Sequence, residues 1–411
     1  MQFLPHLRGT MRRRLSSGGQ VLVAAGLVAG AIGLDPANTQ VHLVFTSMLG
    51  LFAGSLLVGF WRRPRRRHTS FTWHVPGRVV CHGRLPLTLR VTNRDRKPWW
   101  DVEVALVERP PTLRLTEPLY ERVAWLPPGE TMTWQRSLEA TRRGSYRVHA
   151  PIVSTVFPFG LVRWGFMPDE GRTVLVTPVV HPVRSLDMAP GMRYQAGGIP
   201  LASAVGESME LLGVREYRPG DAIRKIHWKL WARRGKPVVR EYQQEFYSRV
   251  ALIVDTFVPR RPTRRHSERF EAAVSAAASL ANAISLQDSI LDIFAAGPEI
   301  YFLTVGRQLG FLQNVMDVLA CVEPCREPPF EKLKAVIGEH LIRVTAVLVV
   351  LMDLDADRLA FLRAIHQTGV WLKVLVVREE PPTLPPADHP DVLEHWKQIR
   401  PSALAADLLE T

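Results

Sequence analysis

The 411-residue sequence contains only three cysteines, at positions 81, 321 and 325. A small, odd number of cysteines argues against a disulfide framework and is typical of a reducing compartment. Cys321 and Cys325 are separated by three residues instead of the two of a redox pair, and no second Cys/His pair stands nearby to complete a zinc site. We therefore expect the cysteines to have structural roles.

The sequence also lacks the short motifs of the common enzyme classes. It has no phosphate-binding Gly-rich loop, no G-x-S-x-G turn, no H-E-x-x-H motif and no convincing catalytic Cys/His pair. Catalytic residues can still converge from distant positions, so an unrecognised activity is not excluded. The sequence predicts a protein that is not an enzyme.

Acidic residues are scarce at the N-terminus. The formal net charge is +13, and residues 1–67 contain nine arginines but one acidic residue, Asp35. These arginines flank two apolar stretches, so they indicate membrane topology and not nucleic-acid binding. We expect a lipid bilayer as a partner and no nucleic acid.

The two apolar stretches predict a transmembrane hairpin within residues 1–67. The spans, about 18–34 and 41–61, contain no charged residue. A spanning helix needs about 20 residues, so the second stretch is long enough and the first is marginal. The connecting loop has no Lys or Arg, whereas arginines precede the first span and follow the second: Arg8, Arg12, Arg13, Arg14, Arg62, Arg63, Arg65, Arg66 and Arg67.

Positively charged flanks stay in the cytoplasm, so this asymmetry predicts a two-span inner-membrane protein whose soluble domains are cytoplasmic. A signal peptide with its apolar core at 18–34 is the alternative. No convincing small-x-small cleavage site follows Leu34, and the arginines after Trp61 would retain the downstream chain in the cytoplasm in either case.

Residues 68–185 have the pattern of a β-domain. Short runs rich in β-branched and aromatic residues alternate with turn clusters such as Pro127-Pro128-Gly129. In the run 85–93, apolar residues alternate with polar ones, as in a half-buried strand. Regularly spaced short strands of this kind predict an all-β sandwich. We see no functional site in this domain.

The segment that follows, 186–249, contains a predicted turn and helix. Pro219 fixes φ and Gly220 tolerates a positive φ, which favours a turn. Asp221 is then expected to cap a helix over residues 222–234 that ends at Gly235.

Two interpretations of the dense charges around this helix remain open. They can form an ion-paired network that fixes the helix against neighbouring strands. Alternatively, Trp228 and Trp231 together with the row Lys225, Lys229 and Arg233 form a basic docking surface, because Trp and Arg are favoured interface residues. His227 can be considered a general base, but a single His without a paired nucleophile is more often structural.

Residues of this segment resemble the signature of domain-of-unknown-function family 58. The matching residues are Arg215, Glu216, Tyr217, Pro219, Gly220, Asp221, Ile226, His227, Trp228, Ala232, Arg233, Arg240 and Glu241. Arg224 and Lys229 lie in the same segment, and we expect them to have structural or docking roles together with the signature residues. The resemblance covers most of residues 15–380. It implies two N-terminal spans, a β-rich insert and, as partners, a MoxR-type AAA+ ATPase and a transglutaminase-like membrane protein in complex or cell-envelope assembly.

Residues 250–380 alternate predicted strands and helices, which indicates a doubly wound α/β domain. Buried strands are expected at 250–255, 344–352 and 371–377, and helices at 264–287, 309–319 and 354–366. With the signature upstream, the domain resembles a von Willebrand factor A-like domain. Residues 381–411 are rich in proline and predict a linker followed by a short C-terminal helix.

Von Willebrand factor A-like domains often bind Mg²⁺ at an Asp-x-Ser-x-Ser loop after the first strand. In residues 255–259 of this sequence, Phe257 and Pro259 stand where the serines would be and supply no side-chain oxygen. Asp255 and Asp353 remain as the candidate ligands. We expect a degenerate domain without a metal cofactor.

These features favour a membrane-anchored, non-catalytic scaffold or assembly factor. The first alternative is a metal-dependent ligand-binding module that uses Asp255 and Asp353, and the second is an enzyme centred on His227.

Overall fold

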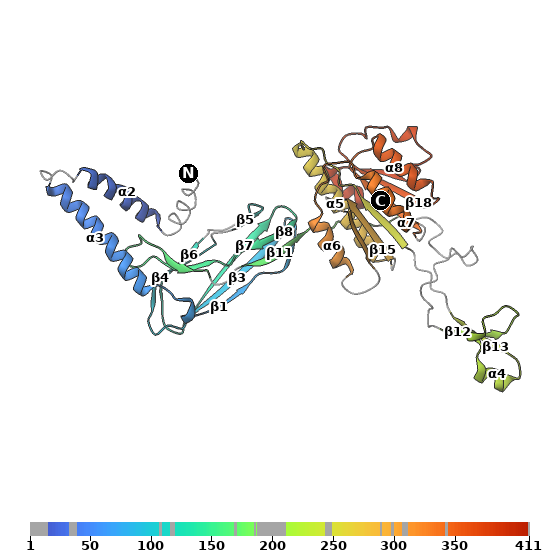
Figure 1. The fold of residues 1–411 in the computed structure, drawn as a ribbon, viewed down its shortest axis with the longest axis horizontal. Coiled ribbons are helices and arrows are strands. Elements are labelled where there is room, and N and C mark those ends of the chain that lie inside the picture. Colours follow the sequence, from blue (N-terminus) through green and yellow to red (C-terminus); the bar gives the residue numbers. More distant parts are fainter. Residues whose placement is uncertain are drawn as a thin grey trace. The chain divides into compact units, whose positions relative to one another are not determined.

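The computed structural model describes residues 15–32, 39–106, 109–115, 120–167, 171–184, 186, 211–242, 249–287, 290–296, 300–305, 311–341 and 344–409. The chain forms two compact units, Met1–Val179 and Val180–Thr411. Figure 1 shows a helical pair and β-sheets in the first unit and an α/β sheet in the second. The chain is therefore a multidomain α+β protein.

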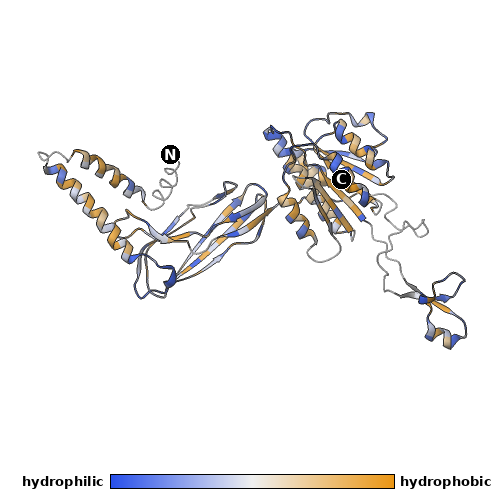
Figure 2. Ribbon diagram, in the orientation of Figure 1, coloured by the Kyte–Doolittle hydropathy of each residue, from blue (hydrophilic) through white to orange (hydrophobic). Residues whose placement is uncertain are grey.

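The first unit begins with two apolar helices, α2 (Ser17–Ile32) and α3 (Thr39–Arg62). Within α3, residues 40–62 are long and apolar enough to cross a membrane. Helix α2 has 16 residues, which is just below the length of about 17 that a span requires. Many of their apolar side chains are exposed, including Leu27 and Leu57, and Figure 2 shows both helices as predominantly hydrophobic. The predicted arginines before residue 15 lie outside the described residues.

After the 3-10 turn η1 (Arg66–His68), the first unit contains three sheets. The first has the order β1 (Thr69–His74), β3 (Arg84–Asn93), β7 (Thr131–Ala140) and β5 (Leu113–Leu115). The second has the order β10 (Trp164–Phe166), β9 (Ile152–Thr155), β4 (Trp99–Ala105) and β6 (Tyr120–Leu126). The third has the order β2 (Arg78–Val80), β11 (Arg172–Thr177) and β8 (Gly144–Val148).

Alternation along the strands builds one core for these sheets. In β3, Leu85, Leu87, Leu89 and Val91 are buried, whereas the intervening residues are not, because successive side chains of a strand point to opposite faces. One hydrophobic cluster joins residues from all three sheets around the buried Trp99 and Trp134. The predicted β-rich region is confirmed.

The second unit contains a small lobe, residues 211–242, with a two-stranded sheet of its own. Strand β12 (Leu211–Glu216) pairs antiparallel with β13 (Val238–Tyr242). Between them lie a 3-10 turn, η3 (Ile223–Lys225), and the short helix α4 (Trp228–Arg234). The predicted continuous helix over 222–234 is therefore wrong: Ile226 leaves the helical path to form a bridge with Val239.

The α/β sheet has the order β16 (Ile300–Val305), β15 (Ile290–Ala296), β14 (Arg249–Val254), β17 (Ala346–Leu351), β18 (Trp371–Val377) and β19 (Trp396–Ile399). All neighbours are parallel except β15 and β16, so the sheet is mixed. When the six strands are numbered by their order in the chain, their order across the sheet is 3-2-1-4-5-6, as in doubly wound folds. The helices are α5 (Arg264–Ser285), α6 (Phe311–Cys321), α7 (Phe330–Leu341), α8 (Ala356–His366) and α9 (Leu404–Leu409).

Helices cover both faces of this sheet, because its central strands β14, β17 and β18 are apolar at nearly every position. In β14, Leu252 packs in a cluster with residues of α5 and α6, whereas Ala251 and Ile253 pack in a second cluster with residues of α7 and α8. A strand buried on both faces reads as a continuous apolar run. The predicted strands 250–255, 344–352 and 371–377 are the three central strands of this sheet.

The C-terminal segment differs from the predicted linker. After the 3-10 turn η4 (Pro386–Asp388), β19 forms the sixth strand of the sheet by pairing with β18. The turn η5 (Pro401–Ala403) leads into α9, whose Leu408 is buried in the same cluster as α5. The prolines therefore shape surface turns of the α/β fold instead of a spacer.

Candidate functional site

The carboxyl edge of the parallel strands is the first candidate site. Strand order reverses between β14 and β17, and ligands of doubly wound folds bind outside the strand ends at such a point. Asp255 directly follows β14, and Asp353 follows β17 after one residue. The fold therefore brings both predicted metal candidates to the edge where a ligand would bind.

The carboxylate of Asp255 is held by three groups. Its Oδ2 accepts hydrogen bonds from Arg358 Nε (2.8 Å) and the Met352 N–H (3.0 Å), and its Oδ1 accepts the Phe257 N–H (2.9 Å). Arg358, from α8, is only 4% exposed and also pairs with Asp355. Burial disfavours the charged guanidinium, but the two carboxylates outweigh it and raise the pKa of Arg358.

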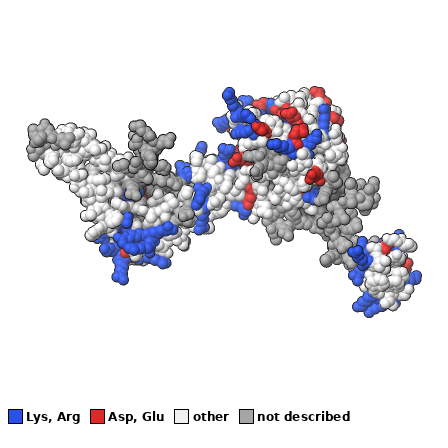
Figure 3. Space-filling model, viewed as in Figure 1, with Lys and Arg blue, Asp and Glu red and all other residues white. Residues whose placement is uncertain are grey.

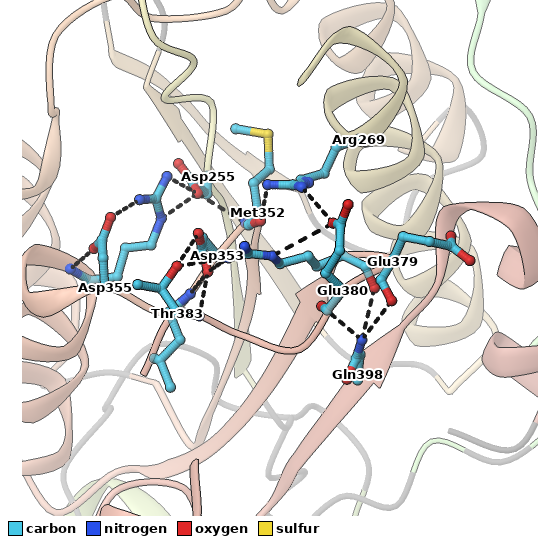
Figure 4. Close-up of polar contacts among 12 residues, drawn as sticks. Asp255, Arg269, Met352, Asp353, Asp355, Glu379, Glu380, Thr383 and Gln398 are labelled. Carbon is cyan, nitrogen blue, oxygen red and sulfur yellow. Dashed lines mark hydrogen bonds and ion pairs between the residues drawn. The ribbon is translucent and has the colours of Figure 1, made fainter. Parts of the chain in front are cut away.

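Asp353 is occupied in a similar way (Figure 4). It forms an ion pair with Arg378 and accepts hydrogen bonds from the Thr383 hydroxyl (2.8 Å), the Thr383 N–H (3.0 Å) and the Leu354 N–H (2.8 Å). Burial alone would raise the pKa of Asp353. The hydrogen bonds from Thr383 and Leu354 and the charge of Arg378 outweigh burial, so the pKa is lowered.

The charge network extends from Asp353 to α5. Glu380 lies 3.9 Å from Arg378 Nε, 3.3 Å from Arg269 Nη2 and 2.9 Å from Arg265 Nη1. Burial and the like charge of Arg378 lower the pKa of Arg269. Figure 4 shows the polar contacts that join Asp353, Glu380 and Arg269, and the Gln398 amide that donates to the backbone carbonyl groups at 378–380.

The residues at this edge do not fit a Mg²⁺ ion. Mg²⁺ requires nearly octahedral oxygen ligands, but the oxygens of Asp255 and Asp353 are engaged by arginines and backbone N–H groups. A dication placed between them would face the guanidinium groups of Arg358 and Arg378. Within the described ranges, no group of three or more His, Cys, Asp and Glu residues is placed to hold a metal.

Sequence reasoning did not single out Arg358 and Arg378, which neutralise this edge. Arg358 stands three residues after the helix-capping Asp355, and Arg378 follows the last residue of β18. These positions are unremarkable in the sequence. That these arginines lie beside carboxylates becomes evident only in the folded structure, where the strand ends lie next to one another.

The lobe is the second candidate site, and its turn is fixed by Asp221. The carboxylate of Asp221 accepts two hydrogen bonds from the Arg215 guanidinium (2.7 and 2.8 Å) and one from the Arg218 N–H (2.8 Å). Pro219 lies in the turn, and Gly220 adopts a φ of 106°, as the turn prediction requires. Asp221 closes this turn and does not cap the helix, which corrects the prediction.

His227 is the residue that caps α4. The imidazole Nδ1 of His227 accepts a hydrogen bond from the Leu230 backbone N–H at 3.3 Å. The backbone N–H of His227 donates to the Val238 carbonyl at 2.8 Å. Gly235 ends the helix with a φ of 69°. The imidazole of His227 therefore supports local structure, and this geometry does not favour a general base.

An exposed aromatic and basic surface lies on the same lobe. The rings of Trp228 and Trp231 stack with centroids 5.3 Å apart, and Trp228 is 59% exposed. Ile223, predicted to share an apolar helix face with Ile226, is instead 68% exposed, whereas Ile226 is buried. Two of the predicted basic row, Lys229 and Arg233, are exposed on α4; Lys225 lies on η3, so the row is not continuous.

The remaining signature residues of the lobe are mostly at its surface. Exposed positions include Glu216, Arg224, Ala232 and Arg240; Tyr217 is partly buried and the side chain of Glu241 lies outside the described residues. Residues 211–242 contain nine basic and three acidic residues. Figure 3 shows Lys and Arg at the margins of the lobe with few acidic groups between them. The lobe therefore carries an excess of basic residues beside the exposed Trp228.

The carboxyl group of Asp221 should titrate at unusually low pH. The hydrogen bonds from Arg215 and the Arg218 N–H lower its pKa from 3.8 to about 2. Because the folded-state value lies below the unfolded one, the turn is stabilised above pH 4 and loses that stabilisation as the pH falls toward 2. In an NMR titration, we expect a midpoint of about 2 for Asp221.

The control for this titration is Arg215→Gln, which should return the midpoint toward 3.8. A midpoint near 3.8 in the unaltered chain would contradict the bidentate pair with Arg215.

Comparison with known proteins identifies one family. Residues 213–388 match the family described as "Protein of unknown function DUF58". "Uncharacterized protein YeaD" of Bacillus subtilis (strain 168) is 22% identical over 232 residues, which cover 56% of this chain and 56% of that protein. The chain thus spans about half the length of this relative.

The similarities to solved structures all have low TM-scores. They include a β-glucosidase from Listeria innocua (TM-score 0.17, 15% identity, 26% of this chain and 16% of that chain). Another is a β-glucosidase from Kluyveromyces marxianus (TM-score 0.14, 18% identity, 26% of this chain and 15% of that chain). Scores this low bear on neither fold nor function. Residues 213–388, which include most of the lobe and most of the α/β sheet, are similar to the DUF58 family.

Proposed function

We propose that this protein is a membrane-anchored, non-catalytic scaffold or assembly factor. In this proposal α2 and α3 form a two-span anchor in the cell inner membrane, and the soluble domains lie in the cytoplasm. The β-region serves as a sandwich-like spacer, and the α/β sheet is a von Willebrand factor A-like domain without a metal. The lobe at residues 211–242 is the docking surface.

The single observation that carries the docking proposal is the exposed Trp228, stacked on the partly buried Trp231, on a strongly basic lobe. Trp and Arg are enriched among the residues that dominate interface energies. The lobe carries nine basic and three acidic residues, which favours an acidic partner surface and rapid association. The family resemblance suggests a MoxR-type AAA+ ATPase as this partner, with a transglutaminase-like membrane protein in the same assembly.

The carboxyl edge of the sheet supports a non-catalytic role. The position where doubly wound folds bind ligands is filled here by guanidinium–carboxylate pairs around Asp255 and Asp353. These pairs engage the carboxylates of Asp255 and Asp353, the two candidate metal ligands at this edge. The network instead makes this end of the domain rigid, which suits a protein that presents surfaces to partners.

Charge reversal on α4 tests the docking surface. The full chain carrying Lys229→Glu and Arg233→Glu should lose affinity for the ATPase in mild detergent by at least about tenfold, because like charges then face the acidic partner. Trp228→Ala should cost about 2 kcal/mol of binding free energy or more. Co-purification followed by quantitative binding of the isolated partner measures both effects.

A matched control is Lys332→Glu with Lys334→Glu, which makes the same charge change at exposed positions of α7. This pair should leave binding within about twofold of the unaltered chain, since a single rim charge contributes little. Equal loss of binding in both double variants would indicate a general charge effect. Full binding by the α4 variant would remove the lobe as the docking surface.

A further inference from the structure

The connection between β9 and β10, residues 156–163, is bonded to the start of α2. The Ser16 N–H donates to the Leu161 carbonyl at 3.0 Å, and the Ser16 hydroxyl donates to the carbonyl groups of Leu161 (3.2 Å) and Gly160. Leu15 forms a bridge with Val162. A loop of the β-region is therefore attached by its backbone to the first turn of an apolar helix.

The same connection packs against the last part of α3. The ring of Trp164 meets Phe60 edge to face, with centroids 5.7 Å apart. Two glycines of α3 face the connection: a Cβ at Gly59 would come within 2.6 Å of the Trp164 ring, and one at Gly54 within 4.0 Å of the Phe159 ring. Contact with Phe159 thus extends well along α3.

The position of Gly54 sets the depth of Phe159. An α-helix rises about 1.5 Å per residue, so Gly54 lies roughly 12 Å along the axis from Arg62. Arg62 ends α3, and arginines at the end of a span lie in the headgroup region. The hydrocarbon core is about 30 Å thick, so a site about 12 Å from the headgroups lies among the acyl chains of one leaflet.

Apolar aromatic side chains of the connection and its neighbours lack a protein cover. Phe159 is 54% exposed. The exposed rings of Trp100 and Trp125 lie 6.2 Å apart, and Trp100 lies 6.2 Å from Phe157, a residue of the same connection as Phe159. Tryptophan favours the membrane interface, where one end of the ring is apolar and the other is hydrated.

The charges near these rings are compensated within the protein. Arg163, which belongs to the connection, donates two hydrogen bonds to the Glu103 carboxylate at 2.9 and 3.1 Å. Arg63 lies 4.2 Å from the centre of the Phe60 ring, at the end of α3 where headgroup phosphates would be. The surface beside α3 therefore presents aromatic rings, and the guanidinium group of Arg63 lies at the level of the headgroups.

We propose that the β9–β10 connection is a second membrane-contacting element that enters one leaflet of the bilayer beside α3. Phe159 lies among the acyl chains, and Trp100 and Trp125 lie at the level of the headgroups. The β-region is then held against the membrane surface. This inference rests on the proposed membrane anchor, because the depth of α3 sets the depth of the loop.

Site-directed spin labelling of the full chain in vesicles of phosphatidylcholine and phosphatidylglycerol tests this placement. Cys81, Cys321 and Cys325 are first replaced by serine, and a nitroxide is attached at Phe159→Cys. We expect the label to be accessible to oxygen and protected from a water-soluble nickel chelate, with an accessibility ratio close to that of a label at Val58→Cys on the exposed surface of α3.

Two further labels give every outcome a meaning. Leu286→Cys, at a highly exposed position of the second unit, reports water, and Trp125→Cys should give an intermediate depth. If the label at position 58 has the accessibility of a lipid-exposed site and the label at position 159 has that of the water-exposed position 286, the loop does not enter the bilayer. The proposed membrane anchor is then still supported. If the label at position 58 is also accessible to the nickel chelate in water, the proposed membrane anchor itself is wrong. An unchanged melting transition of the first unit shows that the labelled chains are folded.

Discussion

Replacing Arg358 with methionine is expected to destabilise the α/β unit by about 3–5 kcal/mol, because the buried carboxylate of Asp255 then loses its counterion. Both side chains of this pair are almost completely buried, at 4% and 0% exposure. For a unit of this size, such a loss lowers the melting temperature by roughly 6–20 °C. Scanning calorimetry or denaturant unfolding of the full chain measures the change.

A double-mutant cycle separates the charge effect from the loss of packing. Asp255→Asn keeps an oxygen for the Phe257 N–H but removes the negative charge. Combining it with Arg358→Met should therefore recover part of the stability that the single variant loses. Arg363→Met is the matched control on α8: Arg363 is exposed, so the expected change is within about 0.5 kcal/mol. Simple additivity in the cycle would contradict a coupled pair.

Trp134→Ala should be equally severe in the first unit, at about 3–5 kcal/mol, because it leaves a large cavity in the β-core. Trp134 is fully buried on β7 and belongs to the cluster that joins the three sheets. Since the substitution lies in the other compact unit, it should lower only the unfolding transition of the β-region. Arg358→Met should lower only that of the α/β unit.

Two controls define the origin of the Trp134 effect. Trp125→Ala removes the same group from a surface position that is 52% exposed and should cost far less. The indole N–H of Trp134 has no hydrogen-bond partner among the described groups, so Trp134→Phe loses packing but no hydrogen bond. We expect a smaller loss for phenylalanine than for alanine. Equal losses would place the stabilisation in the indole N–H.

The regular elements of the α/β unit were predictable from local patterns. The strand predicted at 371–377 is β18, and the helix predicted at 264–287 is α5 with a shorter C-terminal end. Apolar runs and helical spacing reveal these elements because each is buried against the same core. Helix α7 and strand β19 were not predicted. The four residues of β19 are too few to show a period, and they become a strand only by pairing with β18.

In the signature segment, the turn was predicted correctly, but the interaction partner of Asp221 was not. The turn at Pro219 and Gly220 and the helix end at Gly235 are as predicted, since these depend on backbone torsions alone. Asp221 is a favourable capping residue by type. Its carboxylate binds Arg215 instead, because pairing of β12 with β13 brings the turn and the strand together.

The sequence by itself determined the family, the apolar N-terminal pair, the β-rich region and the alternation of strands and helices that follows. These properties depend on residue type and short spacing. The tertiary structure decided that the acidic edge around Asp255 and Asp353 is neutralised by arginines. It also placed Phe159 beside α3. The Asp255–Arg358 pair and the Gly54–Phe159 contact each join residues more than one hundred positions apart, and no local pattern records which distant side chain will fill a given space.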